Sequence, residues 1–160
     1  MISSWKSKKS WGDFVGRIVN SRSLTTKELL RLVPPIILCT DKPNFERIIA
    51  ENGYRQISIN LPLAQSLTGL EPKDIRTIIT DKIRGILPQG EPVYLTDYEM
   101  LFDPRYEIDV LRLLIDLARR NKLIVKWCGK VDGDMLTYAE QGYADYKQYK
   151  MNDYDVVIVV

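Results

Sequence analysis

Short apolar runs alternate with amphipathic segments from residue 36 to residue 160, and this alternation constrains the fold more than any other feature. The first run, Ile36-Ile37-Leu38-Cys39, is apolar throughout, as in a strand whose sheet is covered on both faces. Strands that alternate with helices favour a largely parallel sheet with helices on both sides. We therefore predict a three-layer α/β domain with a mostly parallel five-stranded sheet, whose strands are expected at 36–39, 57–61, 93–97, 123–128 and 156–160.

Helices are predicted between these strands. The first has Gly53 at its C-cap position, and 63–70 favours a short helix. Pro72 begins a longer helix with isoleucines on one face, and 107–121 repeats the amphipathic pattern. The dipeptide Asp132-Gly133 predicts a turn, followed by a short extra strand.

The part of the chain before this domain is basic. Residues 1–33 carry seven Lys or Arg against two acidic residues, a net charge of +5, whereas the remainder carries −3. We predict a polar arm over 1–10, a helix over 11–20 and a second helix that begins with the capping box Thr25-x-x-Glu28. The chain is thus expected to comprise a basic arm with helices up to residue 33 and an α/β domain over 34–160.

The chain contains no histidine and only two cysteines, Cys39 and Cys128. Nucleophile systems that depend on histidine are therefore excluded, as is a zinc site built from Cys and His alone. Any chemistry would have to use carboxylates, Lys, Arg, Tyr or a hard cation such as magnesium. Both cysteines fall in strand-like apolar runs, so we expect buried free thiols in a reducing compartment.

No apolar run approaches the roughly 18 residues that a membrane-spanning helix requires. The first residues, Met1-Ile2-Ser3-Ser4-Trp5-Lys6, lack the apolar core of a signal peptide. The expectation is a cytoplasmic protein without a membrane partner.

The segment after the first strand lacks a phosphate-binding loop. Such a loop needs glycine-rich backbone that curls around phosphates, followed by Lys and Ser or Thr. Here the chain reads Thr40-Asp41-Lys42-Pro43, in which Pro43 removes a backbone donor and Asp41 adds negative charge. Lys42 is a candidate remnant phosphate contact. The alternative is an ordinary helix start that is capped by Thr40 or Asp41.

Two carboxylates follow the third strand. Asp97 comes after four mostly apolar residues, which is the Walker B pattern that holds magnesium. Glu99 lies close behind, where such folds often keep a water-activating carboxylate. Without the loop, Asp97 has no triphosphate-bound metal to hold, so we expect vestigial or structural carboxylates, no catalytic residue and no resident cofactor. Binding of Mg-ATP is the alternative.

Candidates for contact with nucleic acid are Lys6, Lys8, Lys9 and Arg17, because clustered basic side chains neutralise phosphates. A tail that becomes ordered on a protein partner is the alternative interpretation. The tyrosines between 138 and 154 lie among more acidic than basic residues, which favours packing over base stacking.

Several stretches resemble the BrxF family of small P-loop proteins from bacteriophage exclusion (BREX) systems of bacteria. The resemblance covers roughly residues 36 to 160. It rests on Asp97-Tyr98-Glu99-Met100-Leu101-Phe102-Asp103-Pro104, Leu111-Arg112-Leu113-Leu114, Trp127-Cys128-Gly129, Leu136-Thr137-Tyr138-Ala139-Glu140-Gln141-Gly142, Tyr146 and Tyr149.

This resemblance implies a P-loop NTPase fold and a cytoplasmic antiviral complex with larger ATPase, methyltransferase and alkaline-phosphatase-like components. The family's Gly-Lys-Ser/Thr element does not occur at residues 39–45, so only Asp97 and Glu99 carry over from its site. The leading hypothesis is a non-catalytic P-loop-like accessory subunit that acts through protein partners, among them a larger ATPase. The alternatives are a DNA-binding accessory protein that uses the basic arm and a nucleotide-dependent enzyme with an unusual phosphate loop.

Overall fold

A computed structural model describes residues 16–33 and 35–160, which form a six-stranded sheet and a smaller three-stranded sheet. Neighbouring strands of the main sheet are parallel throughout. In spatial order they are β1 (Arg17–Val19), β9 (Val157–Val159), β2 (Ile36–Leu38), β5 (Leu123–Lys126), β4 (Val93–Thr96) and β3 (Arg55–Ser58). The predicted parallel α/β architecture is confirmed, but the prediction of five strands was one strand short.

The missed strand lies where a helix over 11–20 was predicted. Residues 17–19 form β1, which pairs in parallel with β9, and residues 11–15 lie outside the described part of the chain. The apolar spacing of this segment fits a helix, but Ile18 and Val19 are β-branched, and β9 offers them a free sheet edge. Tertiary pairing therefore overrides the local pattern.

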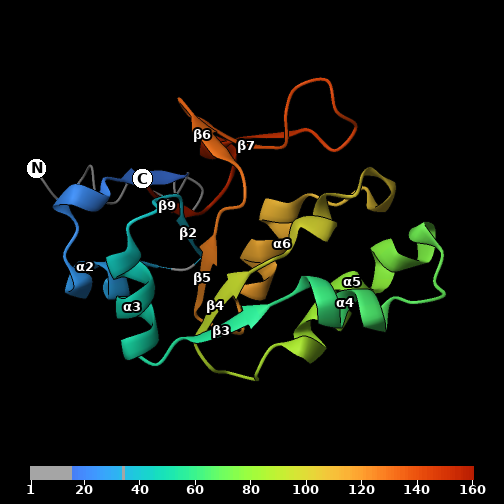
Figure 1. The fold of residues 1–160 in the computed structure, drawn as a ribbon, viewed down its shortest axis with the longest axis horizontal. Helices are drawn as coiled ribbons and strands as arrows, with labels where there is room; N and C mark the ends of the chain where they lie inside the picture. Colours follow the sequence, from blue (N-terminus) through green and yellow to red (C-terminus); the bar gives the residue numbers. More distant parts are fainter. Residues whose placement is uncertain (1–15, 34) are drawn as a thin grey trace, which may run out of the picture.

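Helices cover both faces of the sheet (Figure 1). One face carries α2 (Thr26–Arg31) and α3 (Pro43–Glu51). The other carries α4 (Asn60–Ser66), α5 (Pro72–Ile86) and α6 (Val110–Leu117). Short 3-10 turns complete the described secondary structure: η2 (Ser21–Ser23), η3 (Glu99–Phe102), η4 (Pro104–Tyr106) and η5 (Met151–Asp153).

The predicted start of α2 is confirmed, whereas the C-cap of α3 is Asn52, one residue before the predicted Gly53. At the start of α2, Thr25 Oγ1 accepts from the Glu28 amide over 3.2 Å, and Glu28 Oε2 accepts from the Thr25 amide over 2.8 Å. Beyond α3, Gly53 has a φ of 84°, a left-handed conformation that glycine adopts at low cost.

The second predicted strand, 57–61, is shorter than expected. β3 ends at Ser58 because the amides of Ile59 and Asn60 both donate to the carbonyl of Asp97, at 3.1 and 2.6 Å. These bonds turn the chain into α4 directly, so the predicted short helix starts at Asn60 rather than at residue 63.

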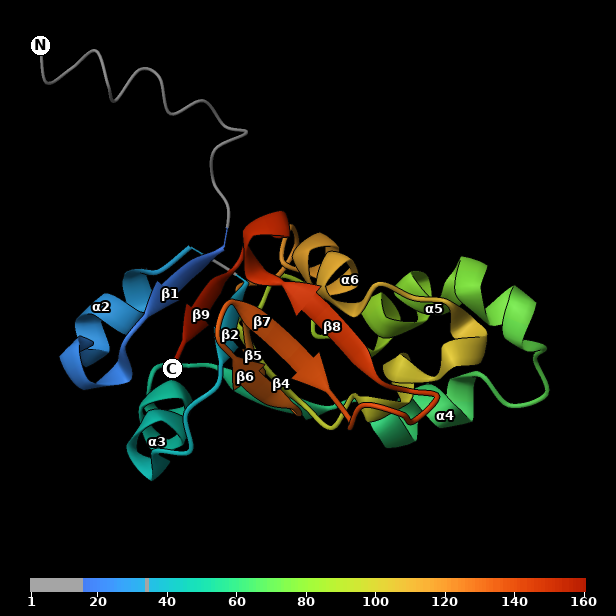
Figure 2. The same ribbon diagram turned by 90° about the horizontal axis from the view of Figure 1, so that it is seen from above.

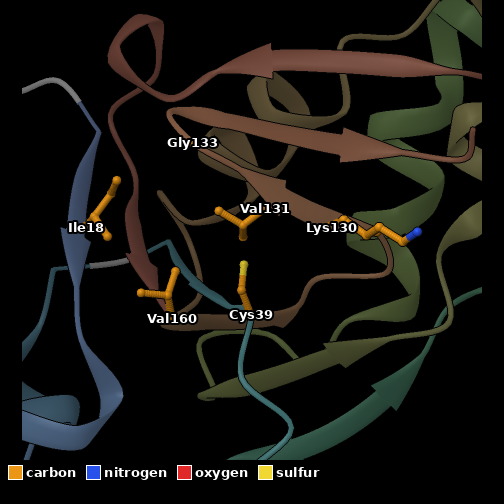
Figure 3. A pocket seen from close by; sticks show the side chains of 7 residues that line it. Ile18, Cys39, Lys130, Val131, Gly133 and Val160 are labelled. Carbon is orange, nitrogen blue, oxygen red and sulfur yellow. The ribbon is translucent and has the colours of Figure 1, made fainter. Parts of the chain in front are cut away.

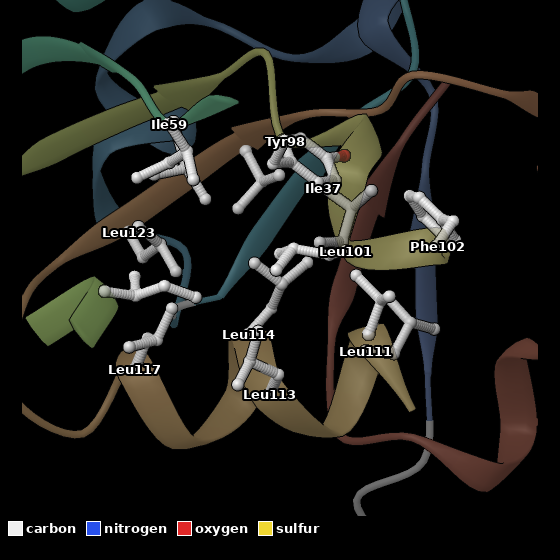
Figure 4. Packing of buried hydrophobic residues seen from close by; sticks show 14 of the residues in the cluster. Ile37, Ile59, Tyr98, Leu101, Phe102, Leu111, Leu113, Leu114, Leu117 and Leu123 are labelled. Atoms are coloured by element: carbon white, nitrogen blue, oxygen red, sulfur yellow. The ribbon is translucent and has the colours of Figure 1, made fainter. Parts of the chain in front are cut away.

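The larger apolar core lies between the sheet and α4, α5 and α6 (Figure 4). Ile37, Ile59, Leu114 and Leu123 are fully buried in it. A second cluster on the other face joins Leu29 of α2 and Ile49 of α3 to the sheet. Every central strand is thus covered on both sides, which explains the wholly apolar runs in the sequence.

The small sheet consists of β6 (Lys130–Asp132), β7 (Met135–Tyr138) and β8 (Lys147–Lys150), all antiparallel (Figure 2). The predicted Asp132-Gly133 turn joins β6 to β7, and Gly133 has a φ of 58°. Phe102 stacks on Tyr138 with ring centroids 3.8 Å apart, and Trp127 Nε1 donates to the Thr137 carbonyl over 3.0 Å. These contacts attach the small sheet to the carboxyl ends of the main strands.

At the carboxyl edge of the main sheet, the connections that follow two neighbouring strands run to opposite faces of the sheet. The chain after β2 enters α3 on one face, whereas the chain after β5, the neighbouring strand, continues to the small sheet on the other. In open α/β sheets, ligands bind beyond the carboxyl ends of the strands at such a switch point. This edge is therefore where a functional site is expected.

Candidate functional site

The loop after β2 is a short link into α3. Lys42 is the N-cap residue and Pro43 occupies the first turn, with no side-chain hydrogen bond to the helix N-terminus. The predicted cap by Thr40 or Asp41 is therefore wrong. Thr40 Oγ1 instead accepts from the Lys42 amide over 3.4 Å, a local turn made before the helix begins. The loop contains no glycine and begins a helix that has a proline in its first turn, so it lacks the curled backbone that cradles phosphates.

Asp97 directly follows β4 and has a φ of 50°, the left-handed region that few non-glycine residues adopt. Its Oδ2 accepts from Ser58 Oγ over 2.7 Å and from Thr96 Oγ1 over 3.4 Å. Its carbonyl accepts the two amides that start α4. Asp97 therefore joins the end of β4 to the β3–α4 junction through both its side chain and its backbone.

Glu99 is held in a similar way. Asn60 Nδ2 donates to Glu99 Oε2 over 2.8 Å, and Asn60 Oδ1 accepts from the Met100 amide over 3.2 Å. One asparagine at the start of α4 thus binds the backbone and the carboxylate of the turn after β4. Asp97 and Glu99 lie at the same edge of the sheet, and each is bonded to a residue from the β3–α4 junction.

Lys126 at the end of β5 is bonded to α3. Its Nζ donates to Glu46 Oε1 over 3.2 Å, and the Tyr94 hydroxyl donates to the same oxygen over 3.1 Å. The Lys126 hydrogen bond and, to a smaller extent, the Tyr94 hydrogen bond hold the pKa of Glu46 below its ordinary value of 4.5. Burial, assisted by the Glu46 charge, raises the pKa of Tyr94. The ammonium group of Lys126 is therefore already paired with a carboxylate.

These groups line a crevice of about 330 Å³ at the carboxyl ends of β3, β4 and β5. Its lining residues are Glu46, Gln56, Thr96, Asp97, Glu99, Lys126, Trp127 and Cys128. Three carboxylates against one ammonium group give this lining a formal charge of −2. Lys42 is not among the lining residues, so the structure does not bring all three predicted site residues together.

Two thiols flank the same edge. Cys39 follows β2, and Cys128 lies two residues beyond β5. Burial raises the pKa of each thiol to about 12. Both groups are therefore protonated near neutral pH and lack the thiolate that a nucleophile or a soft-metal ligand needs. Within the described residues, no group of three or more Cys, Asp or Glu side chains is placed to hold a metal ion.

Sequence reasoning missed Ser58, Asn60, Glu46 and Lys126. Their partners lie 39 to 80 residues away in the chain, so local patterns do not reveal the contacts. One usable signal existed, because polar residues follow the apolar part of β3 and of β5 at the edge where ligands bind.

Of the predicted nucleic-acid contacts, the structure places only Arg17, which is exposed on β1. Lys6, Lys8 and Lys9 lie outside the described residues. No helix in the described part of the chain is long and apolar enough to span a bilayer. Comparison with protein-family models, with curated proteins and with solved structures finds no match to this chain.

Proposed function

We propose that this chain is a non-catalytic, P-loop-like accessory subunit of a bacterial anti-phage defence complex of the bacteriophage exclusion type. It acts through protein partners, among them a larger ATPase, and works in the cytoplasm. The resemblance of residues 36–160 to BrxF-type proteins supports this setting. The observation that carries the non-catalytic part is the glycine-free link Cys39-Thr40-Asp41-Lys42 at the switch point of the sheet.

The arrangement of strands supports a P-loop-like origin. The link after β2 and the carboxylate after β4 lie at one edge, separated by β5. A phosphate loop and a Walker B carboxylate must meet at one edge in this way, because they share a single Mg-nucleotide. The positions of the two elements are compatible with this requirement, whereas the backbone that would cradle phosphate is absent from the described link.

The charge of the crevice argues against nucleotide binding. Its described lining carries −2, and the one cation among these lining residues, Lys126, is bonded to Glu46. A triphosphate placed here would meet like charges without a backbone nest to offset them. Asp97 and Glu99, the two candidates carried over from the family, accept hydrogen bonds that connect structural elements instead.

Thermal unfolding with and without millimolar Mg-ATP tests the absence of a nucleotide site. A ligand that binds the native state raises the unfolding midpoint by mass action, and a concentration of 100 times Kd adds about 2.7 kcal/mol. We expect the same midpoint in both conditions, for the parent chain and for Asp97→Asn. A rise in the parent that Asp97→Asn abolishes would show a working nucleotide site.

Plaque assays test the defence role separately. Deletion of the gene from the genome that encodes it should increase the number of phage plaques. A chain with Asp97→Asn and Glu99→Gln should restore protection as well as the parent chain does, because neither carboxylate is proposed to act in chemistry. Loss of protection with normal folding would instead indicate a catalytic subunit.

The alternative of a DNA-binding accessory protein depends on Lys6, Lys8, Lys9 and Arg17. It predicts salt-sensitive binding to duplex DNA, because contacts with phosphates release counterions. That binding should disappear when residues 1–10 are removed. Retention of defence by the shortened chain would separate this alternative from the proposal.

A further inference from the structure

Within residues 16–33 and 35–160, the main sheet has a corner next to β1 that no other element covers. Ile37, Ile158 and Ile18 occupy one row across β2, β9 and β1, on the face that carries α5 and α6. The first two side chains are 0% exposed, whereas Ile18 is 49% exposed. The apolar row thus continues to β1 at the sheet edge, but the elements that bury it extend only as far as β9.

A groove of about 510 Å³ lies beside this corner. Ile18, Cys39 and Val160 contribute from the main sheet, and Val131 of β6 faces them from the small sheet (Figure 3). Val131 is 36% exposed, although its cross-strand neighbour Leu136 is buried. The small sheet therefore covers only part of the apolar face beneath it and leaves a groove that is open toward β1.

The backbone of β1 is also open along this side. The Arg17 amide donates to the Val156 carbonyl over 3.0 Å, and the Val19 carbonyl accepts from the Val160 amide over 3.0 Å. Residues 17 and 19 thus point their backbone groups toward β9. Backbone groups alternate in direction along a strand, so the N–H and C=O of Ile18 point outward. No described strand pairs with them, and β1 forms the outer edge of the sheet (Figure 2).

The charge along this edge is positive. Between residues 16 and 24 the charged side chains are Arg17 and Arg22, and among the described residues Lys130 is the only charged one that lines the groove. None of these three forms a salt bridge with another described residue. Binding of a segment along β1 would therefore be favoured if the segment carries Asp or Glu next to its apolar residues.

We propose that β1 and the groove bind an extended segment of a partner protein, which adds as a further strand beside β1. The N–H and C=O of Ile18 bond the segment's backbone, and one apolar side chain enters the groove between Ile18 and Val131. Acidic residues that flank this side chain meet Arg17 and Arg22. In strand addition of this kind, main-chain bonds supply affinity and alternate side-chain pockets supply specificity. The inference builds on the proposed function, since an accessory subunit needs a surface that binds its partner.

Selection from a displayed library of random short peptides tests the proposal with the full chain as target. The enriched peptides should share alternating apolar positions with acidic neighbours. Synthetic copies should perturb the Ile18 amide in nuclear magnetic resonance spectra of the labelled chain, and their affinity should fall as salt rises.

Ile18→Pro is the sharpest variant. It removes an outward N–H from an edge strand, a position that tolerates proline, and leaves the bonds of residues 17 and 19 to β9 in place. Loss of one main-chain hydrogen bond should weaken peptide binding by up to about tenfold. Gln56→Pro is the matched control, because β3 is the opposite sheet edge and the Gln56 N–H also points outward. This control should bind peptide as the parent does.

Val131→Asp keeps the proposal testable if Ile18→Pro disturbs folding, because Val131 is on an exposed hairpin strand. It removes an apolar wall and repels acidic peptides, so we expect a loss of more than about tenfold. The proposal is overturned if no peptide is enriched, or if the enriched peptides bind both variants as tightly as the parent. Enrichment of basic peptides, or displacement of bound peptide by duplex DNA, would also overturn it. Nucleotide is absent from these assays, so their failure is distinct from that of the nucleotide test.

Discussion

The hydroxyl of Ser58 at the end of β3 donates to the carboxylate of Asp97 at the end of β4, over 2.7 Å. A carboxylate that follows an apolar strand thus serves as a connection between two neighbouring strands. Because the Asp97 carbonyl also accepts the first amides of α4, this residue determines where β3 ends and α4 begins.

Asp97→Ala should lower the free energy of unfolding by about 2 kcal/mol. Roughly half of this comes from the lost Ser58 hydrogen bond and half from an alanine in the left-handed region. Asp97→Asn should cost much less, because asparagine tolerates this conformation and its side-chain oxygen still accepts from Ser58. Urea unfolding measures both. An Asp97→Ala chain more stable than the parent would instead indicate a carboxylate retained for activity at the expense of stability.

Gly129→Ala should destabilise the chain strongly. A Cβ at this position would collide with the backbone carbonyl of Thr137 and with Trp127, where the small sheet passes over the end of β5. Overpacking of a fitted site typically costs about 1 to 3 kcal/mol, and backbone on the other side of this contact leaves little room for relaxation. We expect a loss at or above the upper end of that range in urea unfolding.

Gly85→Ala is the matched control. Gly85 belongs to α5, a Cβ built there meets nothing within 4 Å except its chain neighbours and the nearby helix backbone, and its φ is not positive. Gly85 lies in the last turn of α5, where alanine should raise stability by up to about 0.5 to 1 kcal/mol, the value for a helix interior. If both substitutions changed the free energy of unfolding equally, the close approach of Thr137 to Gly129 would not be the cause of the change.

The elements that were predicted correctly are those that residues close together in the sequence determine. Pro72 and the isoleucine face of α5 define a helix, and the Asp132-Gly133 dipeptide defines a turn, without help from distant residues. β1 was predicted as a helix because its strand conformation depends on β9, more than 130 residues away in the chain. The sequence spacing of Ile18 and Val19 contains no trace of that partner.

In the candidate site, too, local sequence patterns reveal some residues, whereas others depend on contacts between distant parts of the chain. Asp97 and Glu99 were identified because a carboxylate after an apolar strand is a recognisable pattern. Their donors, Ser58 and Asn60, become visible only when the sheet brings β3 beside β4. Likewise, the expected cap of α3 failed because Thr40 bonds the Lys42 amide before the helix begins.

The two thiols should make the stability of the chain depend on pH in alkaline solution. Burial raises the pKa of Cys39 and Cys128 from 9.0 to about 12. The folded state therefore keeps these protons when the unfolded state has lost them. The resulting stability is fully present below pH 9.0 and is lost as pH rises toward about 12. Urea unfolding at several pH values in that window should show a steeper decline for the parent than for Cys39→Ala/Cys128→Ala. Equal slopes would mean that the thiols ionise freely.

Phe102→Leu should loosen the small sheet in preference to the rest of the molecule. The Phe102 ring is 1% exposed, stacks on Tyr138 and meets the edge of Trp127 at an interplanar angle of 83°. Each aromatic pair contributes about 0.5 to 1.5 kcal/mol beyond area burial, and leucine forms neither pair. We expect a fall of about 1 to 3 kcal/mol in the free energy of unfolding. Hydrogen exchange should accelerate more at β7 amides than at α5 amides.

Phe45→Leu provides the comparison, because Phe45 is also buried but belongs to the cluster on the opposite face, with α2 and α3. It makes the same change in side-chain volume and should leave the exchange of β7 amides close to that of the parent. Exchange that increases equally at β7 in both variants would mean that the small sheet opens only when the whole domain unfolds. Selective exchange in Phe102→Leu would show that the aromatic contacts hold β7, and with it the Val131 side of the groove, against the main sheet.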